Sequence, residues 1–195
     1  MNIVNTISSE LNQENYQKGI KHEYQKFLDS IDVDNSFGFT FNMIQHHPDV
    51  RIKLDDTISY KNFTNFMNRL GSKVFGRREG KSKGTISVYP VLENKKYFDR
   101  LKTWKTNYHY HGIIEIPKYK NGNRVDRNEF KKLMIDCWNK TVWGIIPKYE
   151  LHLNEMIKDL DSSNPTGYMD YIHKKTTITE EDNQPDWENL SYEPE

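Results

Sequence analysis

The chain has 195 residues, of which 35% are hydrophobic and 13% aromatic, with a mean hydropathy of −0.91 and a formal net charge of zero. This length predicts one packed domain with appended tails, and no apolar run is long enough to predict a transmembrane helix. The N-terminus lacks the basic-then-apolar form of a signal peptide, and the single cysteine, Cys137, excludes an internal disulfide and a cysteine-based zinc site. We expect an intracellular protein that does not contact a membrane.

The charge is unevenly distributed along the chain. Residues 176–195 hold seven Asp or Glu and no Lys or Arg, so residues 1–175 hold 28 basic and 28 − 7 = 21 acidic side chains. Between Lys73 and Lys120 there are twelve basic residues and four acidic ones. Such a block suits a polyanionic partner, although a lysine-rich segment is also compatible with ordinary solvated surface.

The first half of the chain alternates between helical and strand patterns. Sparse apolar positions in 10–30 predict an amphipathic helix within an N-terminal extension, residues 1–34. The segment "SFGFTFNMI" (36–44) has period two and predicts a strand. From Thr57, apolar residues three and four apart predict a helix that ends at Gly76.

Two further strands and a helix follow. The basic loop "FGRREGKSKG" (75–84) leads into the strand "TISVYPVLE" (85–93), where Pro90 indicates an edge or a bulge. The run "YHYHGIIEI" (108–116) predicts a third strand. Asp126, with an acid three residues later, predicts the start of a second amphipathic helix.

The remaining segments complete a recognisable order. The segment "IIPKYELHL" (145–153) predicts a fourth strand, and Asn164-Pro165 opens a short helix with two tyrosines. Residues 176–195 lack periodicity, and we expect an acidic disordered tail. The βαββαβ order predicts an α+β fold over 35–175: a ferredoxin-like or RRM-like sandwich with an antiparallel sheet and helices on one face, plus the C-terminal tyrosine-bearing helix. The other face is expected to stay open and to hold a site.

Two histidines one residue apart, His109 and His111, begin the apolar part of the third strand. Residues i and i+2 of a strand point to the same face, roughly 6.6–6.8 Å apart along it, so the two imidazoles can share one divalent metal ion. Imidazole binds several metals, so the pattern does not identify the ion. An isolated His-x-His pair is also compatible with two ordinary hydrogen-bonded histidines.

Two acids are candidates for a third ligand. Glu93 ends the second strand, which should pair antiparallel with the third, and so can lie opposite the histidines. The 15-residue connection 94–108 leaves its register open. Glu115 shares the histidine face but lies about 13 Å farther along a straight strand. Glu93 is therefore the favoured candidate.

The C-terminal helix carries the pattern Tyr-x-x-Lys. Tyr171 and Lys174 are i and i+3 and share a helix face, with Tyr168 one turn earlier. A phenol with a pKa of about 10 is a weak nucleophile at neutral pH, unless a nearby ammonium group and a metal-bound phosphate favour the phenolate. Tyrosine is equally ordinary on a helix that packs against a sheet.

The segments "GFTFN" (38–42), "HYHGIIE" (109–115) and "YIHK" (171–174) together resemble, in order and rough spacing, three motifs of the HUH-type rolling-circle replication initiators. These are the Rep endonucleases of small single-stranded DNA viruses and plasmids. The resemblance spans about residues 36–175. The chain departs from many family members because it has no G-x-x-x-x-G-K-[ST] loop and because the stretch 94–108 is long.

The resemblance implies a metal-dependent site-specific nickase and strand-transferase that initiates rolling-circle replication. His109, His111 and Glu93 would hold Mg²⁺ or Mn²⁺ against the scissile phosphate. Tyr171 would attack to give a 5′-phosphotyrosine link and a free 3′-OH, and Lys174 would help to orient the phosphate. Since some relatives use two tyrosines, Tyr168 is an alternative nucleophile.

The implied partners are single-stranded DNA at a replication origin, within a stem-loop, together with host replication proteins and a separate helicase. The location would be the cytoplasm of a prokaryotic host or the nucleus of a eukaryotic one. The loop side chains that suit phosphate contacts are Arg77, Arg78, Lys81 and Lys83. Three alternatives stay open: a single-tyrosine HUH transposase, a non-catalytic RRM-like nucleic-acid-binding domain, and a hydrolase that uses the histidine pair without a tyrosine.

Overall fold

The computed structural model describes residues 19–45, 53–76, 85–98, 104–119, 121–144, 156–172 and 183–185. A helix over residues 19–30 and a 3-10 turn, Val33–Asn35, precede the sheet. The further elements are β1 (Ser36–Asn42), α2 (Asp56–Phe75), β2 (Val88–Phe98), β3 (Trp104–Glu115), α3 (Arg127–Asn139), β4 (Ile157–Asp159), α5 (Pro165–Ile172) and β5 (Asn183–Pro185). Among the described helices, none has the length and apolar character needed to cross a membrane.

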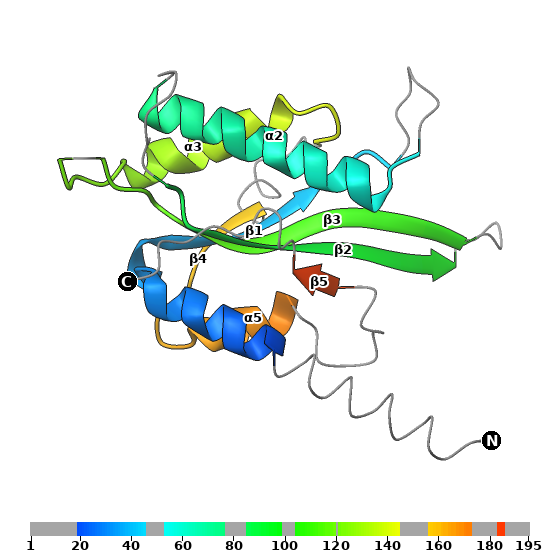
Figure 1. The fold of residues 1–195 in the computed structure, drawn as a ribbon, viewed down its shortest axis with the longest axis horizontal. Coiled ribbons are helices and arrows are strands. Elements are labelled where there is room, and N and C mark those ends of the chain that lie inside the picture. The colour runs from blue at the N-terminus through cyan, green and yellow to red at the C-terminus, as the bar shows by residue number, and fades with distance from the viewer. Residues whose placement is uncertain are drawn as a thin grey trace, which may run out of the picture.

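The five strands form one sheet in the order β4-β1-β3-β2-β5, and every neighbouring pair is antiparallel. The first four strands have the 4-1-3-2 arrangement of the ferredoxin-like sandwich, so the predicted α+β fold is confirmed. Helices α2 and α3, which connect these strands, lie together over one face of the sheet (Figure 1).

The main core lies between the sheet and these two helices. Phe37, Phe39 and Phe41 of β1 point to this side because alternate residues of a strand share a face, and each is at most 2% exposed. The Phe41 ring stacks on Trp138 of α3 with centroids 4.8 Å apart, and it meets Phe66 of α2 edge-on at 5.1 Å. Burial of each such ring stabilises the fold by about 1.5–3 kcal/mol.

The ends of α2 and α3 follow the local signals in the sequence. Asp55 accepts a hydrogen bond from the Ile58 amide at 2.8 Å, and Asp126 accepts one from the Glu129 amide at 2.9 Å. Both carboxylates satisfy amides that have no partner within the helix. Gly76 follows α2 with a φ of 78°, which glycine tolerates, so the predicted start of α3 and end of α2 are confirmed.

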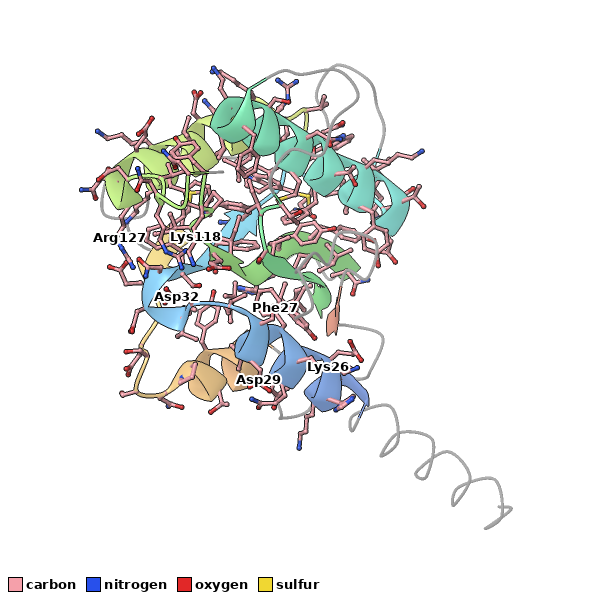
Figure 2. All side chains as sticks on the ribbon, turned by 60° about the vertical axis from the view of Figure 1, so that its left-hand side comes forward. Lys26, Phe27, Asp29, Asp32, Lys118 and Arg127 are labelled. Atoms are coloured by element: carbon pink, nitrogen blue, oxygen red, sulfur yellow. The ribbon has the colours of Figure 1, made fainter. Side chains whose placement is uncertain are left out.

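The opposite face of the sheet is covered over part of its area. The helix over residues 19–30 and α5 both lie on this side (Figures 1 and 2). Phe27 faces the sheet and is fully buried against Tyr89, whereas Asp29 points away from it (Figure 2). The sequence predicts an open face here. Apolar side chains on both sides, Ile113 of β3 among them, explain why this part is closed instead.

The connection between the second and third predicted strands is itself mostly strand. The β2–β3 ladder continues from Glu93↔His109 to Phe98↔Trp104, so most of the stretch 94–108, for which no strand was predicted, is paired. In the described part of the chain, the segment of β3 that precedes His109 has β2 as its one strand partner. A two-stranded ribbon outside the main sheet does not need the apolar alternation by which a strand is recognised in a sequence.

Two C-terminal strands differ in position from the sequence patterns. The strand predicted at 145–153 lies outside the described residues, and the fourth position of the sheet is taken by β4, which pairs with Phe37, Gly38 and Phe39. Strand β5 lies within 176–195 and pairs with β2 from Val91 to Glu93. An open strand edge offers unpaired amides and carbonyls, so even a polar segment can add there. The rest of 176–195 is outside the described part of the chain.

Two glycine substitutions test the packing of the sheet. A Cβ on Gly112 would lie 2.4 Å from the Phe39 ring and 2.5 Å from the Tyr89 carbonyl oxygen, and the carbonyl belongs to backbone. We expect Gly112→Ala to lower the free energy of unfolding by about 1–3 kcal/mol. Gly71→Ala is the matched control, because that Cβ would meet nothing within 4 Å and alanine favours the helix by about 0.5–1 kcal/mol. Urea unfolding monitored by circular dichroism measures both, and equal stability of the two variants would contradict the packing.

Candidate metal centre and its surroundings

The sheet face opposite α2 and α3 carries three rows of residues, each with one member from β1, β3 and β2. The first row is Gly38, Ile113 and Tyr89; the second is Thr40, His111 and Val91; the third is Asn42, His109 and Glu93. The first row lies under apolar side chains of the helix over residues 19–30 and of α5. Polar and titratable groups are concentrated in the second and third rows.

Glu93, His109 and His111 converge at one point of this face. Glu93 Oε2 lies 3.0 Å from His109 Nε2 and 3.1 Å from His111 Nε2, and the two imidazole rings are nearly perpendicular, at 80°. The exposed fractions of the three side chains are 1%, 12% and 3% respectively. One ligand atom from each residue lies within 4.8 Å of the others, so this triad could hold a metal ion. We call these three residues the metal triad.

The ladder register explains how Glu93 reaches the histidines. Glu93 is the cross-strand partner of His109, and His111 lies two residues farther along the same face of β3. Glu115, the other candidate, is four residues beyond His111 and accepts a hydrogen bond from Arg124 at 3.0 Å. The structure therefore groups Glu93 with the two histidines, whereas Glu115 forms a separate ion pair with Arg124.

The chemistry of the metal triad suits a divalent cation. Two imidazole nitrogens and one carboxylate oxygen are common ligands of zinc, manganese and iron, and three protein ligands leave coordination positions for other groups. A carboxylate as buried as Glu93 requires a compensating positive charge or donated hydrogen bonds. A metal ion or a protonated imidazole at this point meets that requirement.

Thr40 is a contact of the triad to which the sequence pattern assigned no role. Its Oγ1 lies 3.0 Å from His111 Nδ1, the ring nitrogen that points away from Glu93. Only the pairing of β1 with β3 brings these two side chains together, 71 positions apart in the chain. The sole available signal was the presence of Thr40 in the segment "GFTFN".

Helix α5 is anchored on the same face as the metal triad. The Tyr168 hydroxyl donates a hydrogen bond to the Phe39 carbonyl oxygen at 3.0 Å, and its ring lies over Gly38 in the first row. Tyr171 is one turn later in α5, and its side chain is outside the described part, as is Lys174. The four basic loop residues lie in the undescribed segment 77–84: Arg77, Arg78, Lys81 and Lys83.

Two other tyrosines near the triad are poor nucleophiles. Tyr108 precedes His109 but packs against the core on the α2 and α3 side. Burial, reinforced by the Asp56 carboxylate, raises the pKa of Tyr108 well above its usual range, so the phenolate is disfavoured. The hydroxyl of Tyr168 is engaged with the β1 backbone and, in this arrangement, is directed at the sheet.

A separate groove of about 630 Å³ lies between α2 and α3, on the other side of the sheet from the metal triad. Its lining includes three cations and no acid: Arg69, Lys73 and Lys140. Lys140 forms an ion pair with Asp136 at 2.7 Å. The groove is thus a basic feature of the helical layer and does not contribute to the triad.

Comparisons with protein-family models, with curated proteins and with solved structures find no match to this chain.

Metal binding by the triad is directly testable. We expect Mn²⁺ at 100 times its dissociation constant to raise the free energy of unfolding by about 2.7 kcal/mol, since the ion binds only the folded triad. Glu93→Gln should abolish most of this gain because it removes the anionic ligand. Glu129→Gln, the same change at an exposed position, is the control. Thermal unfolding with and without Mn²⁺ measures the effect, and an equal response of both variants would contradict the assignment.

Proposed function

We propose that this protein is a metal-dependent endonuclease of single-stranded DNA, a nickase and strand-transferase of the HUH type that initiates rolling-circle replication. The observation that carries the proposal is the presence of the metal triad and the tyrosine-bearing helix α5 on one face of the sheet. If α5 lay on the far face, the triad and a tyrosine could not act on one phosphate.

Helical and strand spacing support a meeting of Tyr171 and the metal triad. Tyr168 is seated on the first row, and His111 is in the next row, roughly 6.6–6.8 Å along the strand. One helical turn advances about 5.4 Å, and α5 runs in the direction from β4 toward β5 (Figure 1). Strand β5 pairs with β2 at Glu93, so α5 would run toward the triad end of the face, and position 171 is in its C-terminal turn.

The chemistry is a phosphoryl transfer. Glu93, His109 and His111 would hold a Mg²⁺ or Mn²⁺ ion, which would supply Lewis-acid polarisation of the scissile phosphate. The Tyr171 phenolate oxygen forms a bond to phosphorus, the bond from phosphorus to the 3′ oxygen breaks, and this oxygen takes up a proton to become a 3′-OH. The phenol proton passes to water. Lys174 would stabilise the negative charge on the phosphate oxygens.

The fold argues against a non-catalytic RRM-type module. Such a module stacks bases on aromatic side chains of an exposed sheet face. Here Phe37, Phe39 and Phe41 are buried beneath α2 and α3. The Tyr89 side chain on the other face is covered by the helix over residues 19–30. These four aromatic residues are therefore unavailable for stacking.

The proposed partner is single-stranded DNA at a replication origin, presented in a stem-loop, with host replication proteins and a separate helicase. The loop residues Arg77, Arg78, Lys81 and Lys83 would contact phosphates and set affinity and salt dependence. A single-tyrosine transposase would use the same chemistry on a different DNA, so the sequence of the DNA that is cleaved distinguishes these two readings.

Capture of covalent adducts from a pool of random single-stranded DNA tests the proposal without knowledge of the origin. With Mn²⁺, we expect an SDS-stable protein–DNA adduct, whose DNA is then sequenced, and chelation with EDTA should abolish it. Tyr171→Phe should lose the adduct, whereas Tyr168→Phe, which keeps the ring on Gly38, should retain it. Cleavage that survives Tyr171→Phe would instead indicate a hydrolase that uses the triad alone. Absence of any adduct from the whole pool would contradict the proposal.

A further inference from the structure

We propose that β1 is the positioning element of this site, with two residues of the face that it shares with the metal triad in separate roles. Thr40 orients the ring of His111 for metal binding. Gly38 leaves room for the Tyr168 ring, whose contact with β1 holds α5 on the sheet. The part of the inference that concerns catalysis rests on the proposed function. The two contacts themselves do not, because they are properties of the folded chain.

Thr40 acts on the second row. Its Oγ1 is 3.0 Å from His111 Nδ1, while His111 Nε2 points at Glu93 from 3.1 Å. A histidine that binds a metal through Nε2 carries its proton on Nδ1, and this N–H needs an acceptor. The Thr40 hydroxyl oxygen is that acceptor, and it holds both the tautomer and the ring orientation in which the Nε2 lone pair is directed at the triad.

Gly38 acts on the first row. A Cβ at this position would lie 2.6–2.9 Å from Cζ, Cε2 and Oη of Tyr168. Any side chain larger than hydrogen would therefore displace the Tyr168 ring and stretch its 3.0 Å hydrogen bond to the Phe39 carbonyl oxygen. Glycine suits position 38 because it has no Cβ and so lets the Tyr168 ring contact the strand backbone directly.

The strand itself cannot move away to make room. Phe37, Phe39 and Phe41 anchor β1 from the other side of the sheet and are at most 2% exposed. The strain of a substitution at Gly38 would consequently fall on Tyr168 and α5, which form the more weakly held layer.

These two roles are separable although the residues are neighbours. Gly38 and Thr40 are i and i+2 on one strand, so these two positions are about 6.6–6.8 Å apart along it. Each contacts a different partner, and His111 and Tyr168 come from different elements. Loss of one contact should leave the other intact.

Three variants test this division of roles. Thr40→Val keeps the shape but removes the hydroxyl, and we expect it to weaken Mn²⁺ binding by about 10–100-fold. Thr40→Ser keeps the hydroxyl and should retain near-wild-type affinity. Gly38→Ala should leave Mn²⁺ affinity unchanged but accelerate amide hydrogen exchange in 165–172 as α5 undocks. Isothermal titration with Mn²⁺ and hydrogen exchange read by mass spectrometry measure the two effects independently of any DNA reaction.

A double-mutant cycle tests whether Gly38 acts through Tyr168. Tyr168→Ala alone should undock α5, and Gly38→Ala added to it should produce no further acceleration, because the ring that clashes is already gone. Additive effects of the two substitutions on the exchange rate would contradict the proposal that Gly38 acts through its contact with Tyr168. Equal loss of Mn²⁺ affinity in Thr40→Val, Thr40→Ser and Gly38→Ala would show that these substitutions act only by disturbing β1 as a whole. That result would overturn the inference.

The proposed function can fail separately from this inference. If no variant and no wild-type protein forms a DNA adduct, the metal affinities and the exchange rates still decide the roles of Thr40 and Gly38. If adducts form, Gly38→Ala should lower their yield at saturating Mn²⁺, whereas the defect of Thr40→Val should be corrected by more metal.

Discussion

The pairing of β3 with β1 on one side and β2 on the other is the constraint on which the site depends. Ile113, His111 and His109 each face a residue of both neighbours, and this alignment creates the three rows. Since side chains alternate along a strand, a slip of one residue would turn both histidines into the apolar core and bring Tyr110, now fully buried, to the site face. The many rings that pack on the other side therefore hold the register and, with it, the metal triad.

Burial sets the chemical character of the triad. Glu93 and His111 are 1% and 3% exposed, and His109, at 12%, is the member most open to solvent. In such surroundings electrostatic attraction to a cation is weakly screened, and the ligands have little freedom to reorient. Among the described residues, the more exposed side of the triad is that of His109 and its third-row neighbour Asn42. The first row is closed by Phe27, Tyr168 and their neighbours.

The two layers of the molecule have different roles. Helices α2 and α3 form a large aromatic core with the sheet and contribute no residue to the triad. The helix over residues 19–30 and α5 form a smaller hydrophobic cluster with the site face of the sheet. Its buried residues are Phe27, Leu28, Tyr89, Val91 and Ile113, and Tyr168 of α5 packs against them. A smaller buried surface stabilises less, so α5 is the element whose position is most easily altered by substitutions beneath it.

Local patterns in the sequence were sufficient for β1, for the ends of α2 and α3 and for the two histidines of the triad, but they missed β4, β5 and the paired stretch after Glu93. Period-two alternation placed β1, the carboxylate at Asp126 marked the start of α3, and i, i+2 geometry put His109 and His111 on one face. These are short-range properties, which the chain expresses wherever the element lies. The register of Glu93, the contact of Thr40 with His111 and the docking of Tyr168 on Gly38 depend on residues 16 to 130 positions apart. Only tertiary packing decided them, because cross-strand register and helix docking are set by the fit of whole surfaces rather than by any local pattern.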